Sequence, residues 1–220
     1  MEEKIREILI FALPILFAIA LHEAAHAYAA KYFGDKTAYQ QGRMTLNPLS
    51  HIDLFGTIII PILLFLQFGV GIGYAKPVPV NFGNLRHPKR DMAWVALAGP
   101  AANFVMAVLW GLLGIALFAF GVNEPFFVEM VNAGIRVNLA ILAFNLLPIP
   151  PLDGGRIVVS FLPHQYAYKY SKLEPYGFFI VLGLAMLPIF NFWGIWMQPV
   201  MGVAGVMVNF VLRPFIMLLS

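Results

Sequence analysis

The stretch Leu21-His22-Glu23-Ala24-Ala25-His26 lies inside an apolar run that extends from Ile8 to Ala30. Residues four apart lie on the same face of a helix, so His22 and His26 can direct two imidazole nitrogens to one metal ion. Ionisable side chains are costly in an apolar helix of membrane-spanning length, and there they mark functional sites. The stretch therefore predicts a membrane helix, from about residue 7 to residue 32, that carries part of a metal site.

Glu23 completes a His-Glu-x-x-His pattern. Its carboxylate can reach a water at the metal without being a ligand, which is the position of the general base in zinc peptidases. A catalytic zinc usually has three protein ligands and an open position for water, so the two histidines need a third partner. Because the chain has no cysteine, this partner must be a histidine, an aspartate or a glutamate.

The composition places most of the chain in lipid. Of its 220 residues, 60% are hydrophobic and only 11% are charged, whereas soluble domains carry about 25% charged residues. We therefore expect one multi-pass domain over residues 1–220 in the cell membrane. The net charge of +3 is small and scattered, which favours loops at a lipid bilayer and argues against a nucleic-acid surface.

The order of the apolar stretches predicts an all-α integral membrane protein, a polytopic bundle of about five to six membrane segments. After the metal helix, the expected segments are 54–70, 92–120, 131–145, 156–162 and two spans within 176–220. Residues 121–129 are expected to form a loop. Three prolines and two glycines between Asn145 and Gly155 must interrupt the helix there.

The region near residues 54–81 is harder to interpret as a simple span. Residues 54–70 contain Gly56 and Pro61 and read as a short span or as a re-entrant hairpin. The following residues, 71–81, alternate like a strand, but Pro77 and Pro79 cannot donate ladder hydrogen bonds. We therefore expect a short membrane-embedded re-entrant or β-like segment, either an edge strand or an irregular extended segment.

The basic residues indicate an orientation. If residues 54–70 re-enter without crossing, seven Lys and Arg residues between positions 31 and 91 lie on one side, together with Lys169 and Lys172. The other side then keeps only Lys4 and Arg6. Basic loops stay in the cytoplasm, which puts the site within the bilayer and nearer the cytoplasmic side. If residues 54–70 cross fully, the loop at 71–91 lies on the same side as the N-terminus. The basic residues then still favour one side, but they place the His-Glu-x-x-His motif less clearly.

Asp153 is the strongest candidate for the third ligand. It lies within an interrupted apolar segment, where a carboxylate needs a cation, and a metal ion supplies one. A salt bridge to Arg156, three residues further on, is the alternative. His51, His87 and His164 lie in polar loops, where a solvated or interfacial histidine is expected.

Three motifs together resemble the site-2 protease family of intramembrane zinc metalloproteases: His22-Glu23-x-x-His26, Ala98-Gly99-Pro100 and Asn145-x-x-Pro148-x-x-x-x-Asp153-Gly154. The resemblance covers about residues 20–160. It is closest to the compact prokaryotic branch that lacks a PDZ or CBS domain, whose members are similar in Asn47-Pro48-Leu49 and in residues 75–81. One departure is that some members have a further span before the metal helix, for which this sequence leaves no room.

The resemblance implies one Zn²⁺ per chain with three ligands, His22, His26 and Asp153. It also implies that Glu23 is the catalytic base, that Asn145 positions the substrate or the developing oxyanion, and that residues 72–81 lie beside the substrate. The substrate would then be a transmembrane protein or peptide. Because a transmembrane helix hides its amides in internal hydrogen bonds, it must unwind before attack, and pairing with residues 72–81 would satisfy the freed groups.

Other functions remain compatible with the same residues. A metal or ion transporter could use His22, Glu23, His26 and Asp153 as a transport site, because interrupted helices in the membrane also suit transporters. No inverted repeat is visible in support of it. A membrane-anchored peptidase acting outside the bilayer would be expected to have a large extramembrane domain, which is not evident. A catalytically idle scaffold would have no need of a general base.

Overall fold

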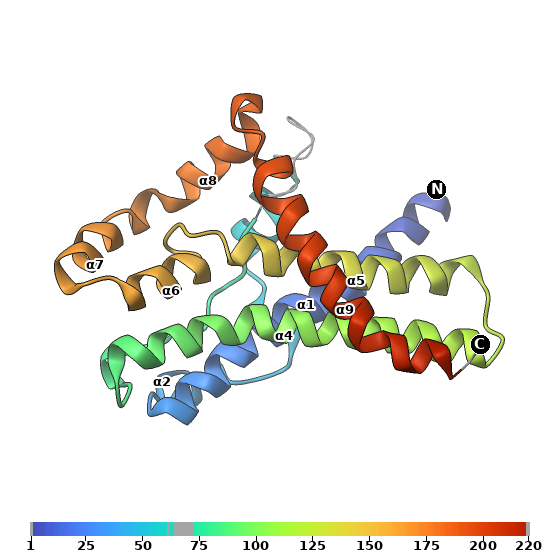
Figure 1. The fold of residues 1–220 in the computed structure, drawn as a ribbon, viewed down its shortest axis with the longest axis horizontal. Helices are drawn as coiled ribbons and strands as arrows, with labels where there is room; N and C mark the ends of the chain where they lie inside the picture. The colour runs from blue at the N-terminus through green and yellow to red at the C-terminus, as the bar shows by residue number, and fades with distance from the viewer. Residues whose placement is uncertain (1, 61, 64–72, 219–220) are drawn as a thin grey trace.

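The computed structural model describes residues 2–60, 62–63 and 73–218, which form a bundle of helices (Figure 1). No strand occurs among these residues. Four helices are long and apolar enough to cross a membrane: α1 (Glu2–Phe33), α4 (Pro88–Ala119), α5 (Pro125–Asn145) and α9 (Gln198–Met217). The expectation of an all-α membrane bundle is confirmed.

Shorter elements connect the long helices. They are α2 (Thr37–Gln40), η1 (Pro48–His51), η2 (Leu54–Ile59), η3 (Phe82–Asn84), α6 (Asp153–Phe161), α7 (His164–Ser171), η4 (Glu174–Tyr176), α8 (Gly177–Met186), η5 (Pro188–Phe190) and η6 (Trp193–Met197). The apolar helix α8 has ten residues, about 15 Å, which is too short to cross a bilayer alone. Four helices of the described part of the chain are thus candidates for full spans, whereas the five to six membrane segments expected also counted short and re-entrant segments.

One expected boundary is wrong. Residues 121–129 were expected to form a loop, but α5 already begins at Pro125. Proline fits the first turn of a helix, where its missing N–H has no partner to lose. The acidic Glu129 therefore belongs to the helix, and its Oε1 accepts a hydrogen bond from Arg6 Nη2 of α1 at 2.8 Å.

Helix α4 organises the bundle, because it packs against α1, α5, α6 and α9. Small residues allow the close approach that membrane helices need. A Cβ atom on Gly134 of α5 would overlap the Trp110 ring, and one on Gly111 would overlap Leu212 of α9. Buried apolar side chains fill the space between these helices: Ala107, Leu139, Leu142, Ala204, Val208 and Leu212.

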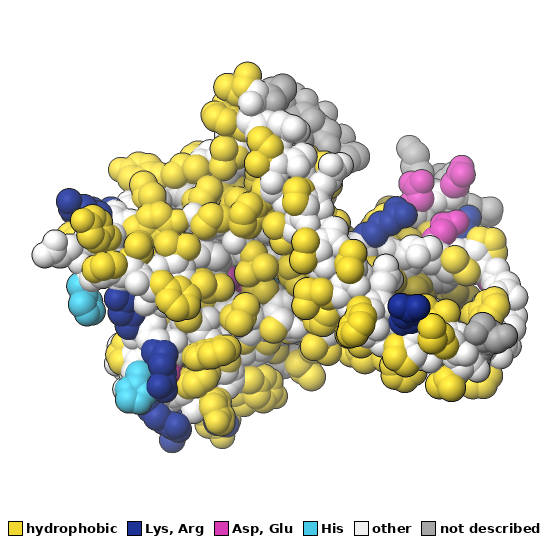
Figure 2. Space-filling view, viewed as in Figure 1, with side chains coloured by type: hydrophobic (Ala, Val, Ile, Leu, Met, Phe, Trp, Pro, Cys, Tyr) yellow, Lys and Arg dark blue, Asp and Glu magenta, His cyan; other side chains and the backbone are white. Residues whose placement is uncertain are grey.

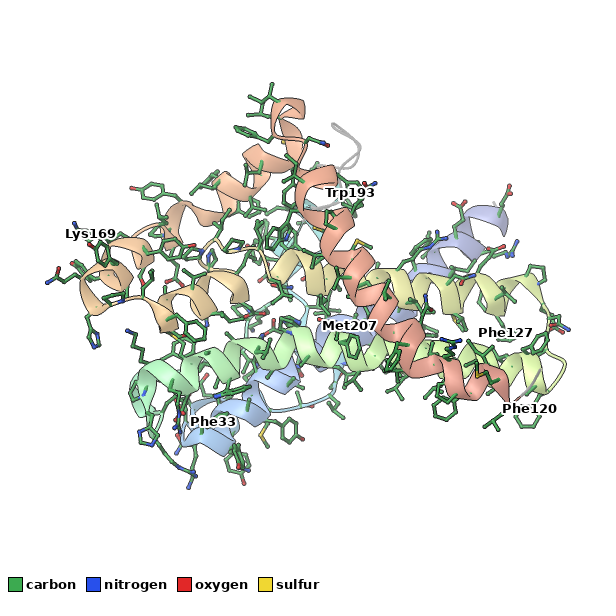
Figure 3. The ribbon with its side chains drawn as sticks, viewed as in Figure 1. Phe33, Phe120, Phe127, Lys169, Trp193 and Met207 are labelled. Atoms are coloured by element: carbon green, nitrogen blue, oxygen red, sulfur yellow. The ribbon has the colours of Figure 1, made fainter. Side chains whose placement is uncertain are left out.

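The bundle has two distinct ends (Figure 3). Phe33, the last residue of α1, and Lys169 of α7 lie toward one end. Phe120 and Phe127, which flank the turn between α4 and α5, lie at the other. The His-Glu-x-x-His motif is in the half of α1 that runs toward the first end, which we call the metal end.

The segment 73–81 is extended but is not a strand, so the irregular alternative is the one observed in the described residues. The part of the expected re-entrant region at residues 64–72 lies outside them. Four backbone N–H groups tie the segment to the rest of the protein. Tyr74 donates to the Gly56 carbonyl and Lys76 to the His51 carbonyl, both at 2.9 Å, while Val78 and Asn81 donate to side-chain carboxylates, Asn81 to Asp35 Oδ2 at 2.7 Å.

His51 is buried, and the expectation that it is solvated is therefore wrong. It ends η1, which packs against α1, and its Nε2 lies 3.0 Å from the Thr45 carbonyl oxygen. The neighbouring residues in the sequence are polar and predict a loop at the surface. The burial of His51 arises because this loop folds back onto the bundle.

Asp35 anchors the loops at the metal end. Its carboxylate accepts hydrogen bonds from the backbone and hydroxyl of Thr37, from the backbone of Asn81 and from the side chain of Asn84. Burial alone raises the pKa of Asp35, but these hydrogen bonds outweigh it and hold the pKa below its ordinary value. The ionised form of Asp35 therefore stabilises the fold.

We expect Asp35→Asn to lower the free energy of unfolding by about 2 kcal/mol at pH 7, because the new amide group faces donors that need an acceptor. A carboxylate with a lowered native pKa contributes stability above its unfolded pKa, about 3.9, and loses it as the pH falls through the native value. The difference in thermal unfolding between wild type and Asp35→Asn should therefore shrink in acid. Equal unfolding temperatures at pH 7 would contradict the anchoring role.

Candidate metal centre

The structure brings together three of the predicted site residues. His22 and His26 lie one turn apart on α1, and their Nε2 atoms are 3.1 Å from each other. Asp153 is the first residue of α6, and its Oδ2 lies 3.2 Å from His22 Nε2 and 3.4 Å from His26 Nε2. The three side chains together could hold one metal ion. They are almost completely shielded from solvent by the bundle.

The second nitrogen of each imidazole shows which ring nitrogen carries the proton. His22 Nδ1 lies 2.6 Å from Asn103 Oδ1, and His26 Nδ1 lies 2.7 Å from the Val95 carbonyl oxygen. Both oxygens accept hydrogen bonds, so in the neutral rings the protons are on Nδ1. Each Nε2 atom therefore directs a lone pair into the cluster, as in a metal-binding histidine.

Asp153 Oδ2 is buried and has no hydrogen-bond partner among the described residues. An unpaired buried carboxylate oxygen is costly, and two imidazole lone pairs facing it add to the cost. A cation between the three atoms removes this cost. Arg156, the alternative ion-pair partner of Asp153, pairs with another residue: its Nη2 lies 3.8 Å from Glu174 Oε1. Two imidazole nitrogens and a carboxylate oxygen form a ligand set that suits zinc.

Gly99 of α4 provides the space for the cluster. A Cβ atom at this position would lie 2.6 Å from His22 Nε2 and even closer to His26 Nε2. The Ala98-Gly99-Pro100 patch therefore has a specific role beyond helix packing. It lets the backbone of α4 approach the face of α1 on which the two metal-ligating nitrogens lie.

Two further glycines position Asp153. A Cβ atom on Gly154 would overlap the Leu146 carbonyl, and one on Gly155 would overlap the backbone of Pro150. The helix is interrupted, as the prolines and glycines of this stretch predicted, and the chain that leaves α5 lies directly against the first turn of α6. This close contact carries Asp153 to the histidines.

The other two predicted site residues, Glu23 and Asn145, make their hydrogen bonds outside the three-residue cluster. The Glu23 carboxylate is directed at the extended segment, where Oε2 accepts a hydrogen bond from Val78 N at 2.8 Å. Asn145 is the last residue of α5, and its Nδ2 donates to the Ile141 carbonyl of its own helix at 3.0 Å. No hydrogen bond joins Asn145 to the three-residue cluster within the described ranges.

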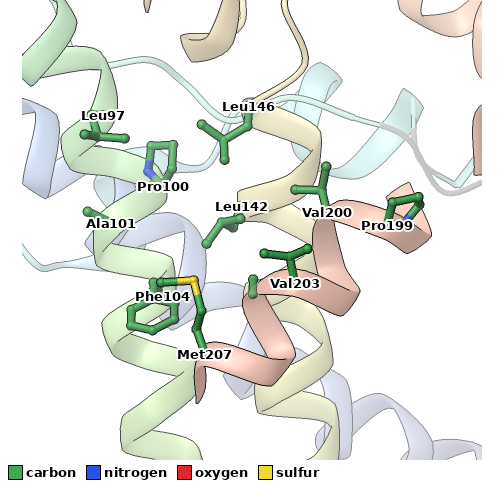
Figure 4. A pocket seen from close by; sticks show the side chains of 11 residues that line it. Leu97, Pro100, Ala101, Phe104, Leu142, Leu146, Pro199, Val200, Val203 and Met207 are labelled. Atoms are coloured by element: carbon green, nitrogen blue, oxygen red, sulfur yellow. The ribbon is translucent and has the colours of Figure 1, made fainter. Parts of the chain in front are cut away.

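Two cavities are lined by residues of the elements that surround the centre, although none of the three cluster residues lines either of them. An apolar groove of about 420 Å³ runs between α4, α5 and α9 (Figure 4), and its lining includes Pro100, next to Gly99, and Leu146, next to Gly154. A second cavity of about 340 Å³ is lined by Val80 of the extended segment, by the prolines that precede α6 and by Arg156. The Arg156 guanidinium lies 5.0 Å from the centre of the Phe82 ring.

Comparison with known proteins agrees with this geometry. The sequence profile described as Peptidase family M50 matches residues 122–190, a range that includes Asp153. YwhC of Bacillus subtilis, whose name places it among the zinc metalloproteases, is 38% identical over 184 residues, which cover 80% of this chain and 79% of YwhC. The chain belongs to peptidase family M50.

Other relatives of this M50 peptidase also have zinc metalloprotease names. Rip2 of Mycolicibacterium smegmatis is 33% identical over 81% of this chain and 67% of its own length. MJ0392 of Methanocaldococcus jannaschii is 27% identical over 71% of this chain and 35% of its own length. No solved structure gives a significant match. The chain is therefore a membrane metalloprotease, and its described residues include four helices long and apolar enough to cross a bilayer.

Sequence reasoning missed three contributors to the centre of this M50 peptidase: Asn103, the Val95 carbonyl and Val78 N. Asn103 carries the only usable signal, because it is a polar residue in an apolar helix one turn after Gly99. The other two are backbone groups, whose positions depend on tertiary packing and which a side-chain pattern does not reveal.

Proposed function

We propose that this M50 peptidase hydrolyses peptide bonds within or next to transmembrane segments of membrane proteins. One zinc ion would be held by His22, His26 and Asp153. The observation that carries the proposal is the unpaired Asp153 Oδ2, which faces two imidazole lone pairs inside a bundle of membrane-spanning helices. We further propose that residues 1–220 act as a single membrane-embedded protease domain.

Held by His22, His26 and Asp153, a zinc ion would supply a water whose pKa is lowered toward about 7 and a positive charge for the scissile carbonyl. Glu23, next to the ligand His22, is the proposed general base: it accepts the proton of the attacking water and delivers it to the leaving amine. Its hydrogen bond with Val78 N fixes the carboxylate between the ligand cluster and the extended segment. Asn145 is the proposed amide donor to the oxyanion, which requires it to turn away from the Ile141 carbonyl.

The extended segment 73–81 is the proposed platform for an unwound substrate. The N–H groups of Tyr74, Lys76, Val78 and Asn81 already donate within the protein. Pro77 and Pro79 have no N–H to offer. The carbonyls of Tyr74, Lys76 and Pro77 already accept hydrogen bonds from Thr57 and Arg43, so a substrate strand would pair with the backbone groups of the segment that these contacts leave over.

The distribution of charge supports a site nearer the cytoplasmic side. Figure 2 shows many of the Lys, Arg and His side chains over the metal end, whereas Asp and Glu side chains gather near the N-terminus of α1, beside a few Lys and Arg side chains. Basic residues of the loops, the short helices and the first turn of α4 at the metal end include Lys36, Arg43, Lys76, Arg86, Lys89, Arg90, Lys169 and Lys172. Basic loops are retained in the cytoplasm during insertion.

The test uses the full chain purified in detergent and reconstituted in liposomes. We expect about one zinc per chain by elemental analysis and cleavage of a transmembrane substrate whose helix is weakened by glycine or proline. A chelator should abolish cleavage and added zinc should restore it. A chain that binds zinc, cleaves no such substrate and carries zinc across the liposome membrane would favour the transporter instead.

A further inference from the structure

A chain of buried amide groups leads from the metal ligand His22 to the backbone of α5. Asn103 of α4 accepts from His22 Nδ1, and its Nδ2 donates to Asn138 Oδ1 at 3.0 Å and to the Ala18 carbonyl at 3.2 Å. Asn138 Nδ2 in turn donates to the Gly134 carbonyl at 2.8 Å. Both asparagines are completely buried, in a part of the bundle that otherwise consists of apolar and small side chains.

The backbone carbonyls at the ends of this chain determine which atom of each asparagine amide donates and which accepts. A carbonyl oxygen only accepts, so Asn138 must direct Nδ2 at Gly134 and Oδ1 at Asn103. Asn103 must then direct Nδ2 at Asn138 and Ala18, which leaves its Oδ1 for His22. The remaining proton of a neutral His22 ring therefore belongs on Nδ1, and Nε2 is left unprotonated toward Asp153.

We infer that Asn103 and Asn138 are positioning residues that set the tautomer and ring orientation of His22 for metal binding. The inference rests on the proposed function, because it concerns the same zinc site. The two metal-ligating histidines reach this state differently: His26 bonds directly to the Val95 carbonyl, whereas His22 depends on two side chains. Losing either asparagine would therefore weaken one ligand and spare the other.

A purely structural role makes a different prediction. Interhelical hydrogen bonds between polar side chains stabilise membrane bundles, so removing Asn103 could simply loosen the contacts between α1, α4 and α5. In that case the folded protein would bind zinc as tightly as wild type once folding is restored. In the positioning role, zinc affinity falls in protein that is fully folded, because an acceptor that orients a metal-bound histidine is lost.

The decisive measurement is the zinc dissociation constant of the folded full chain in detergent, obtained by competition with a chromophoric chelator. We expect Asn103→Leu to weaken binding about 10-fold to 100-fold, the usual effect of losing such a partner. Asn138→Leu leaves the Asn103 amide held by the Ala18 carbonyl alone, so that it turns over more readily, and should weaken binding less. Asn103→Asp keeps an acceptor for His22 Nδ1 and should recover much of the affinity that Asn103→Leu loses.

Trp196→Phe is the matched control, because it removes another interhelical hydrogen bond to α5, from Trp196 Nε1 to the Ala143 carbonyl, away from the metal ligands. It should leave zinc affinity within about twofold of wild type. Folding is checked by the thermal unfolding of each zinc-free protein. A folded Asn103→Leu variant with wild-type zinc affinity would overturn the inference.

A second measurement does not depend on zinc. In the zinc-free wild type labelled with ¹⁵N-histidine, we expect the His22 signal, identified by its loss in His22→Ala, to report the Nδ1–H tautomer. In Asn138→Leu it should report a mixture. An unchanged His22 tautomer would contradict the relay even if Asn103→Leu fails to fold. If the wild type binds no zinc, the proposed function fails, and the tautomer measurement still decides whether the relay exists.

Discussion

Replacing Glu23 with glutamine is expected to lower the rate of peptide hydrolysis about a thousandfold while zinc remains bound. General acid–base catalysis contributes about 10²–10⁴-fold, and the amide of glutamine cannot accept the proton of the attacking water. Glutamine has nearly the same shape as glutamate, and its oxygen can still accept the hydrogen bond from Val78 N that glutamate accepts at 2.8 Å. The fold around the site should therefore be preserved.

The measurement is kcat on a transmembrane substrate together with zinc content, for wild type and Glu23→Gln. Glu129→Gln serves as the control, because it removes a carboxylate from the opposite end of the bundle, where it pairs with Arg6 on the surface. Exposed ion pairs contribute about 0–1 kcal/mol, so this variant should keep full activity. Residual activity of Glu23→Gln near the wild-type level would remove Glu23 from the mechanism.

Replacing Gly99 with alanine is expected to remove the metal and, with it, the activity. The added methyl carbon would lie 2.6 Å from His22 Nε2 and closer still to His26 Nε2, in the place where the ligands converge. Carbon and nitrogen atoms that are not bonded do not approach this closely, so one helix or both rings must shift. We expect zinc content below a tenth of the wild-type value, a loss of about 1.4 kcal/mol or more in binding.

Gly202→Ala is the matched control for this substitution. Gly202 lies in the membrane helix α9, and an added Cβ atom would meet no neighbour within 4 Å. Alanine has the higher helix propensity, so this variant should fold and bind zinc as wild type does. Gly99→Ala protein that is folded and still carries one zinc per chain would show that the observed approach of α4 to α1 is not required.

The metal helix and its partner were predictable because their signals are local. His22 and His26 share a helix face through their spacing, and the prolines before Asp153 and the glycines after it identify the interruption that brings this acid inward. The expected alternative, a salt bridge from Asp153 to Arg156, was reasonable by spacing alone. It fails because α6 directs Arg156 toward Glu174 and the Phe82 ring instead.

The remaining features depend on packing between distant parts of the chain. Asn103 and Asn138 are 35 positions apart, and only the crossing of α4 and α5 joins their amides. The burial of His51 depends on how its loop folds against α1. The start of α5 at Pro125 was misjudged because acidic residues near a helix N-terminus resemble a loop, although they also suit the positive end of the helix dipole.

The hydrogen bond from Val78 N to Glu23 has a pharmacological consequence. Both neighbours of Val78, Pro77 and Pro79, lack a backbone N–H, so neither can replace Val78 as the donor to Glu23. A small displacement of this segment would therefore release the Glu23 carboxylate. The cavity that includes Val80 and Phe82 lies at the end of the same segment. Because we propose Glu23 as the base, we expect a compound bound there to lower activity without contacting His22, His26 or Asp153.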